Sequence, residues 1–329
     1  MSLTQRFLRA TPMRLDTTAT LDEIEAQMTL PISAPQAQIQ KTGWGSFLDG
    51  DNILNLPNFT PTVHPPVRFT AVREEPETLA ARYYYFKRNP TLRKLEPANA
   101  DPSSYHVLKA IDVLISPIPD AENSFTVLVA SWDRDETTYA SNALKSLVGL
   151  LDQDVILHAD TSILDFIDDD FFLWLVARSL QNVEITEDMS LDGIRRMDTK
   201  DALHHTVNMG AGIDATRGEL LYLVAQDQVS FGPGRLNVAH DRLGINLDFE
   251  LKVNGGFSIT MKTTEFTAID EEDEHLAELE RRLRAFQQAA HVVIPELKET
   301  WQRDSVWRTS GRAEFREDCR AETNRRTNA

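Results

Sequence analysis

The feature of the sequence that most constrains the fold is a pair of alternating apolar stretches, residues 243–251 and 257–266, joined by Asn254-Gly255-Gly256. Apolar side chains at every second position are typical of strands with one buried face, and the Asn-Gly connection favours a tight hairpin turn. The chain is therefore expected to contain an antiparallel sheet. Alternation also predicts strands at residues 37–41, 67–72 and 182–190. Residues 125–131 are expected to form a buried strand and residues 155–158 a short one.

Apolar residues at helical spacing predict several amphipathic helices among these strands. They span residues 21–28, 76–88, 105–115, 135–151, 162–178 and 270–298. The last of them begins with the acids 270–274 and has arginines in its middle, an order that complements the helix dipole. Together these elements predict an α+β fold, with mixed antiparallel sheets, several amphipathic helices and a long C-terminal helix.

Three shorter segments have weaker patterns. Thr42-Gly43-Trp44-Gly45 is interpreted as a turn, and Gly232-Pro233-Gly234 is expected to break the chain. Residues 220–225 fit either a helix or a strand.

The length of 329 residues allows one large domain or two smaller ones. Residues 1–300 are interpreted as one α+β subunit, in which two lobes would divide near residue 152. Residues 301–329 are expected to be a loosely held polar tail. No stretch approaches the 18 or so apolar residues of a membrane span, and the single cysteine, Cys319, favours a reducing, cytoplasmic location.

Residues 82–94 combine five basic and four aromatic residues with no acid, in a chain whose net charge is −17. Such a segment either neutralises the protein's own acids or stays exposed for an anionic partner, and both interpretations remain open. A phosphate backbone is the usual partner of a basic track. The track consists of Arg82, Lys87, Arg88, Arg93, Lys94 and Lys109.

The aromatic residues of this segment suggest base stacking, but Tyr84 and Tyr85 fit the buried stripe of the predicted helix. At least two of the four aromatics are therefore expected in the core. With its cations turned outward, the helix favours phosphate contact over base stacking.

No motif of an enzyme is present. Asp168-Asp169-Asp170 would point in three directions on a helix, so a solvated face is favoured over a metal site. His204 and His205 would face opposite sides of a strand. Gly210, Gly212 and Gly218 do not form a dinucleotide-binding pattern. We therefore expect no catalytic residue, no metal and no cofactor.

The order of the elements is nevertheless informative. An early helix is followed by Gln40-Lys41-Thr42-Gly43-Trp44, and the segment 108–117 ends in Ser-Pro before a strand. The strand at 125–130, the segments 185–188 and 217–231, and the long C-terminal helix follow in turn. In this order the chain resembles the RdgC family of recombination-associated DNA-binding proteins. It departs from the family most at residues 76–104.

The resemblance implies an α+β subunit of a ring-like homodimer that encloses double-stranded DNA, with basic residues on the inside. Binding would be independent of sequence, would restrict access of a RecA-type recombinase, and would involve no reaction. The protein would then be cytoplasmic and associated with the nucleoid. Lys41 and Arg217 lie near basic positions of the family and join the candidate DNA-binding residues.

Two other functions remain as alternatives. The first is an acidic interaction protein, such as a nucleic-acid mimic or an inhibitor of a DNA-processing enzyme, that uses the faces around 168–170 and 270–274. The second, with less support, is a metal-dependent hydrolase.

Overall fold

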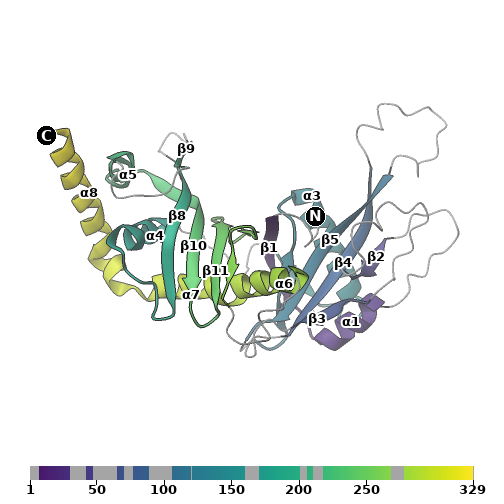
Figure 1. The fold of residues 1–329 in the computed structure, drawn as a ribbon. Helices are drawn as coiled ribbons and strands as arrows, with labels where there is room; N and C mark the ends of the chain where they lie inside the picture. Colours follow the sequence, from purple (N-terminus) through teal and green to yellow (C-terminus); the bar gives the residue numbers. More distant parts are fainter. Residues whose placement is uncertain are drawn as a thin grey trace, which may run out of the picture. The chain divides into compact units, whose positions relative to one another are not determined.

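The structure, a computed structural model, describes residues 7–29, 42–46, 65–69, 77–88, 106–119, 121–159, 170–200, 206–209, 218–267 and 278–328. Contacts divide the chain into two units, Met1–Ile163 and Leu164–Ala329. Each unit contains an antiparallel sheet and helices (Figure 1), so the predicted α+β class is confirmed. The division follows Ile163 and not the predicted position near residue 152.

The first unit is built on a sheet in the strand order β2-β4-β5-β6-β1, with β3 beside β4 and β7 beside β1. All of these pairs are antiparallel. The strands are β1 (Phe7–Asp16), β2 (Gly43–Gly45), β3 (Val67–Phe69), β4 (Thr78–Arg88), β5 (His106–Pro117), β6 (Ser124–Val129) and β7 (Ile156–His158).

Two helices cover one face of this sheet, α1 (Leu21–Thr29) and α3 (Arg134–Val148). A capping box starts α1, because the Glu23 amide donates to Thr20 Oγ1 (3.2 Å) and the Thr20 amide donates to Glu23 Oε2 (2.8 Å). Asp133 caps α3 by accepting from the Glu136 amide. Their apolar stripes pack into one core with β4, β5 and β6, which confirms both predicted helices.

The second unit is built on a sheet in the order β12-β11-β10-β8-β9, with β13 beside β11. Its strands are β8 (Met189–Lys200), β9 (Thr206–Met209), β10 (Ser230–His240), β11 (Ile245–Leu251), β12 (Phe257–Thr260) and β13 (Glu265–Phe266). β11 and β12 form the hairpin that the sequence predicted around Asn254-Gly255-Gly256.

The second unit also contains five helices among the described residues. They are α4 (Asp170–Gln181), α5 (Gly218–Val224), α6 (Glu278–Gln288), α7 (Ile294–Arg303) and α8 (Arg312–Thr327), with π-helical turns η5 (Ala289–Val293) and η6 (Trp307–Gly311). In Figure 1, α4 lies against β8 and β10, and α6, η5 and α7 form one continuous rod. The described parts of the predicted helices at 162–178 and 270–298 are therefore helical.

Two carboxylates join α4 to the C-terminal helices. The indole of Trp174 on α4 donates to Asp304 Oδ2 (2.9 Å), and the indole of Trp307 donates to Asp170 Oδ2 on α4 (2.8 Å). Asp304 also accepts from the Trp307 amide (2.9 Å) and from Arg178 (2.7 Å). These bonds fix the chain beyond α7.

Two predicted helices, 76–88 and 105–115, are wrong, because both segments are strands, β4 and β5. Side chains on both faces of these strands are buried, including Ala80, Ala81, Ile111 and Leu114. A strand that is buried on both faces has a nearly continuous apolar run, which also matches a helical spacing.

Three shorter predictions are also wrong. Residues 43–45 form β2 instead of a turn, and of the predicted strand 182–190 only Met189 and Ser190 are extended, as the start of β8, while 182–188 form a turn and bends. The chain does not break at Gly232-Pro233-Gly234, because β10 continues through it with a shift of register between Phe231 and Gly234. The predicted strand at 37–41 lies outside the described residues.

The C-terminal segment is not a loose tail. α8 buries Phe315 and Cys319, and it packs against α5. The guanidinium of Arg316 is also buried and donates to the backbone carbonyls of Val224 (2.9 Å) and Gln226, at the end of α5. A side chain of α8 thus satisfies backbone carbonyls at the C-terminal end of α5. Among the described helices, none is long and apolar enough to cross a membrane.

We expect Asp304→Ala to lower the free energy of unfolding by about 2–4 kcal/mol, because it leaves an indole and a guanidinium without their acceptor. Bonds from the Trp307 amide, Trp174 and Arg178 outweigh burial and lower the pKa of Asp304. Its contribution should therefore be present above the unfolded pKa of about 3.9 and be lost as the pH falls through the lower folded value.

Urea titration would measure the effect, with Asp241→Ala, an exposed aspartate of the same unit, as the control. Equal midpoints for the two variants would contradict this role of Asp304.

Candidate nucleic-acid interface

The basic and aromatic segment singled out in the sequence lies on β4. Because successive strand residues face opposite sides, Arg82 and Tyr84 lie on one face of the sheet and Tyr83, Tyr85 and Lys87 on the other. Tyr84 and Tyr85 are both buried, which confirms that at least two of the aromatics belong to the core. The cations are thus divided between the two faces and do not form one outward row.

Arg82 is not a surface residue. The β4–β5 register places it directly opposite Asp112, and both residues are completely buried. Its Nε lies 2.7 Å from Asp112 Oδ1 and its Nη2 3.1 Å from Oδ2, which is a bidentate ion pair. Arg82 therefore neutralises one of the protein's own acids, and its prediction as a DNA contact is wrong for this arrangement.

Lys87 and Lys109 remain available at the surface. Lys109 lies opposite Tyr85, and Lys87 lies opposite Val107, so the two lysines are diagonal neighbours on the same face. Lys109 is exposed, whereas Lys87 is about one-third exposed, with Nζ 3.8 Å from Asp135 Oδ2. The remaining predicted contacts, Lys41, Arg93, Lys94, Arg217 and the side chain of Arg88, lie outside the described residues.

An aromatic row leads to these lysines. Trp44 contacts Tyr83 (ring centroids 5.0 Å apart), Tyr83 lies parallel to Tyr85 (6.1 Å, 4°), and Tyr85 stacks on Tyr139 of α3 (5.0 Å, 24°). Burial, followed by the charges of nearby carboxylates such as Glu136, raises the pKa of Tyr85. Tyr139, at the end of the row, is 47% exposed.

A second basic cluster, absent from the predicted sites, lies on the second sheet. The pairing of β8 with β10 shifts register between Arg235 opposite Arg196 and Leu236 opposite Ile194. Arg195 is thus the extra residue of a bulge, and a bulge redirects side chains. Arg195 and Arg196 consequently both reach the open face of the sheet, although they are adjacent in the sequence.

The carboxylate of Asp248 organises this cluster. Asp248 is completely buried, and Arg235 holds it through Nε (2.7 Å) and Nη2 (2.8 Å). Arg195 Nε lies 3.6 Å from the same carboxylate. The hydrogen bonds to Asp248 raise the pKa of Arg235. We call Arg195, Arg196 and Arg235 the arginine cluster.

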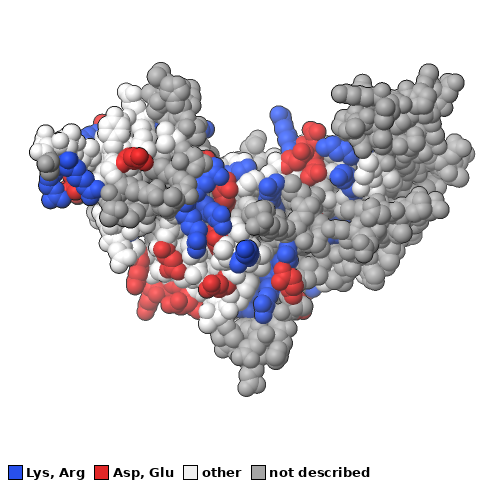
Figure 2. All heavy atoms as spheres, turned by 45° about the horizontal axis from the view of Figure 1, so that its top comes forward, with Lys and Arg blue, Asp and Glu red and all other residues white. Residues whose placement is uncertain are grey.

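All three guanidiniums of the arginine cluster are partly exposed, and those of Arg196 and Arg235 are hydrogen-bonded to carboxylates. Arg196 pairs with Asp198 (3.2 Å), and the side chains of Arg195, Arg196 and Arg235 are 52%, 43% and 32% exposed. A guanidinium has five N–H donors, and each bidentate pair uses two of them. Several donors therefore face solvent. Figure 2 shows Lys and Arg side chains gathered on the viewed face of this unit, with acidic side chains mostly below them.

Sequence reasoning missed the arginine cluster for a physical reason. Alternation along β8 places Arg195 and Arg196 on opposite faces, and only the bulge brings them together. Arg235 is far away in the sequence and joins them through strand pairing. The adjacent Arg195-Arg196 pair within an alternating stretch was the one available signal.

Other candidate chemistry finds little support in the described part of the chain. Asp170 is not on a solvated face, since it is buried and accepts from Trp307. Asp168, Asp169, His204 and His205 lie outside the described residues. Within the described residues, no group of His, Cys, Asp and Glu side chains is suited to holding a metal ion.

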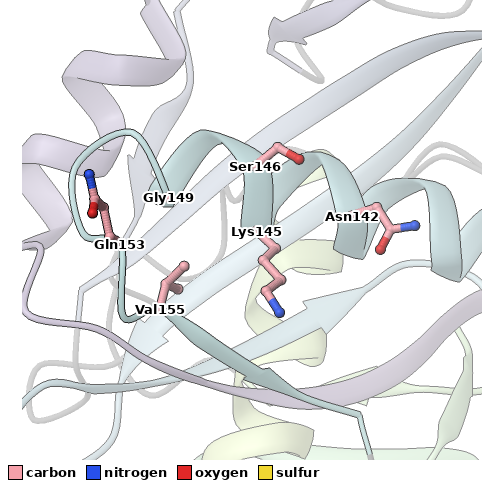
Figure 3. A pocket seen from close by; sticks show the side chains of 6 residues that line it. All are labelled: Asn142, Lys145, Ser146, Gly149, Gln153 and Val155. Carbon is pink, nitrogen blue, oxygen red and sulfur yellow. The ribbon is translucent and has the colours of Figure 1, made fainter.

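The first unit also has an open hollow beside α3. Figure 3 shows that Lys145 and Ser146 point to opposite sides of the helix, and that Gln153 points away from both. Asn142, Gly149 and Val155 also line this hollow.

Comparison of the chain with protein-family models, with curated proteins and with solved structures finds no match. The resemblance to RdgC therefore stays a prediction.

Arg82→Leu should lower the free energy of unfolding by about 3–5 kcal/mol, because the Asp112 carboxylate would stay buried without its guanidinium. Lys87→Leu, on the same strand but partly exposed, should cost less than about 1 kcal/mol. Chemical unfolding of both variants measures the difference. An Arg82→Leu protein that is as stable as the wild type, but binds DNA less tightly, would show that Arg82 is a contact residue after all.

Cys319 should react slowly with thiol reagents in the native protein. Burial, with a smaller contribution from Asp318, raises the pKa of its thiol to about 11. At pH 8 the thiolate should be roughly a hundredfold scarcer than that of a free cysteine. A chromogenic disulfide reagent would measure the rate before and after denaturation, and equal rates would contradict burial of the thiol.

Proposed function

We propose that this protein is a non-enzymatic, sequence-independent binder of double-stranded DNA. The observation that carries the proposal is the arginine cluster on the neighbouring strands β8 and β10. Carboxylates hold the guanidiniums of Arg235 and Arg196 by hydrogen bonds, Arg195 lies 3.6 Å from Asp248, and all three side chains are partly exposed. Phosphate oxygens are acceptors that such donors fit by both charge and geometry.

The cluster favours contact with the phosphate backbone over reading of bases. Side chains that are held by carboxylates on a sheet cannot extend far into a groove, and phosphate contacts carry no sequence information. Lys87 and Lys109 add two cations in the first unit. The remaining acidic surface of a chain with a net charge of −17 would repel DNA elsewhere, which restricts binding to such basic surfaces.

Nearby acids limit the affinity. Glu250 lies opposite Arg235 across β10 and β11, and Asp198 already pairs with Arg196. The excess positive charge is therefore small, and we expect moderate binding that weakens with salt.

The resemblance to RdgC would add a ring-like homodimer in the nucleoid and control of RecA access. These features form part of the proposal, and they rest on the resemblance alone. The alternative function is that of an acidic interaction protein, which would not bind DNA and would co-purify with a basic partner.

A matched pair of double variants tests the function. Arg195→Gln with Arg196→Gln should weaken duplex binding about tenfold, because two phosphate contacts are lost. Arg325→Gln with Arg326→Gln removes the same charge from another adjacent, exposed pair, on α8, and should change binding little. Fluorescence anisotropy with a labelled duplex measures all three proteins.

Glu250→Gln should tighten binding, since it removes a negative charge beside Arg235 without touching its bond to Asp248. Such a gain of affinity cannot arise from misfolding. If neither the arginine variants nor Glu250→Gln alters duplex binding, the proposed interface is wrong. If the wild-type protein does not bind DNA, the acidic interaction protein becomes the better explanation.

A further inference from the structure

We propose that the exposed ring of Tyr139 is a stacking site for an unpaired base of a single-stranded nucleic acid. The proposal rests on the proposed function only in taking nucleic acid as the partner, and it concerns the first unit instead of the arginine cluster. Its basis is the aromatic row that ends at Tyr139 between α3 and β4.

The ring of Tyr139 is held in place by its neighbours and is partly exposed, as a stacking site requires. One face of its ring lies against Tyr85, whose own ring is parallel to that of Tyr83. Tyr85 and Trp44 are buried, so the row is anchored in the core, yet Tyr139 is 47% exposed. Tyr85 covers one ring face and nearly half of the residue is in solvent, so the face away from Tyr85 is the one to which the proposal assigns the base. A ring that is held in place loses little conformational freedom when a base stacks on it.

The surroundings of the ring fit a nucleotide. Lys109 lies opposite Tyr85 on the same face of the sheet and is exposed, and Lys87 is its diagonal neighbour. Val107, opposite Lys87, is 37% exposed and extends the apolar surface. An aromatic ring flanked by lysines is the combination that single-stranded nucleic acids favour.

Acidic side chains near Tyr139 offset the positive charge of the two lysines. Asp133 caps α3 and Glu136 accepts from the Ser131 hydroxyl (2.7 Å), whereas Asp135 is exposed and lies near Lys87. Two lysines against these acids provide no strong cationic field. Most of the affinity should therefore come from the ring, and it should depend on salt less than duplex binding does.

The experiment compares a labelled oligothymidylate with an abasic oligonucleotide of equal length, which has the same phosphates but no bases. The wild type should bind the oligothymidylate about tenfold more tightly. Tyr139→Leu should remove this preference, whereas Tyr139→Phe should keep it. Tyr222→Leu, a change at a tyrosine of α5 that is 57% exposed, is the matched control and should leave the preference intact.

A second readout uses Tyr139→Trp, whose fluorescence should be quenched by the oligothymidylate and not by the abasic strand. The proposal is overturned if the wild type binds both strands equally, or if Tyr139→Leu, folded by circular dichroism, keeps the preference. Duplex binding that depends on the arginine cluster would then still support the proposed function. Conversely, a preference that depends on Tyr139 would stand even if duplex binding were absent.

Discussion

The first unit depends on the buried ion pair between Arg82 and Asp112. A slip of one residue between β4 and β5 would turn every side chain to the other face and would leave both charges without their partner. The pair therefore fixes the register. That register in turn places Tyr85 on the helix-covered face, where it stacks on Tyr139, and places Lys87 and Lys109 beside it.

The second unit uses the same chemistry with a different outcome. Asp248 is as deeply buried as Asp112, and it too is held by a bidentate arginine. Arg82 is sealed in the interior, whereas Arg235 stays partly exposed and is joined by Arg195 through the bulge of β8. One carboxylate thus neutralises its arginine, and the other orders a cluster that still has free donors. This difference decides which basic residues can meet a phosphate.

Much of the fold could be predicted from the sequence, where one face of an element is polar. The helices α1 and α3 and the β11–β12 hairpin follow from their periodicity and turn residues. β6 is buried on both faces and was predicted from its short apolar run. β4 and β5 could not, because burial on both faces removes the alternation that marks a strand. The candidate site depends on contacts that are distant in the sequence. In the sequence Arg82 belongs to a basic track, and only the pairing of β4 with β5 places Asp112 opposite it. The arginine cluster depends on a bulge in β8 that alternation does not predict.

The salt dependence of duplex binding by the wild-type protein tests the central claim most directly. If the arginine cluster contacts two or three phosphates, the logarithm of the association constant should fall linearly with the logarithm of salt concentration, with a slope of about −2 to −3. A slope near zero, or no retention of duplex DNA at low salt, would contradict the assignment of this surface to a phosphate backbone.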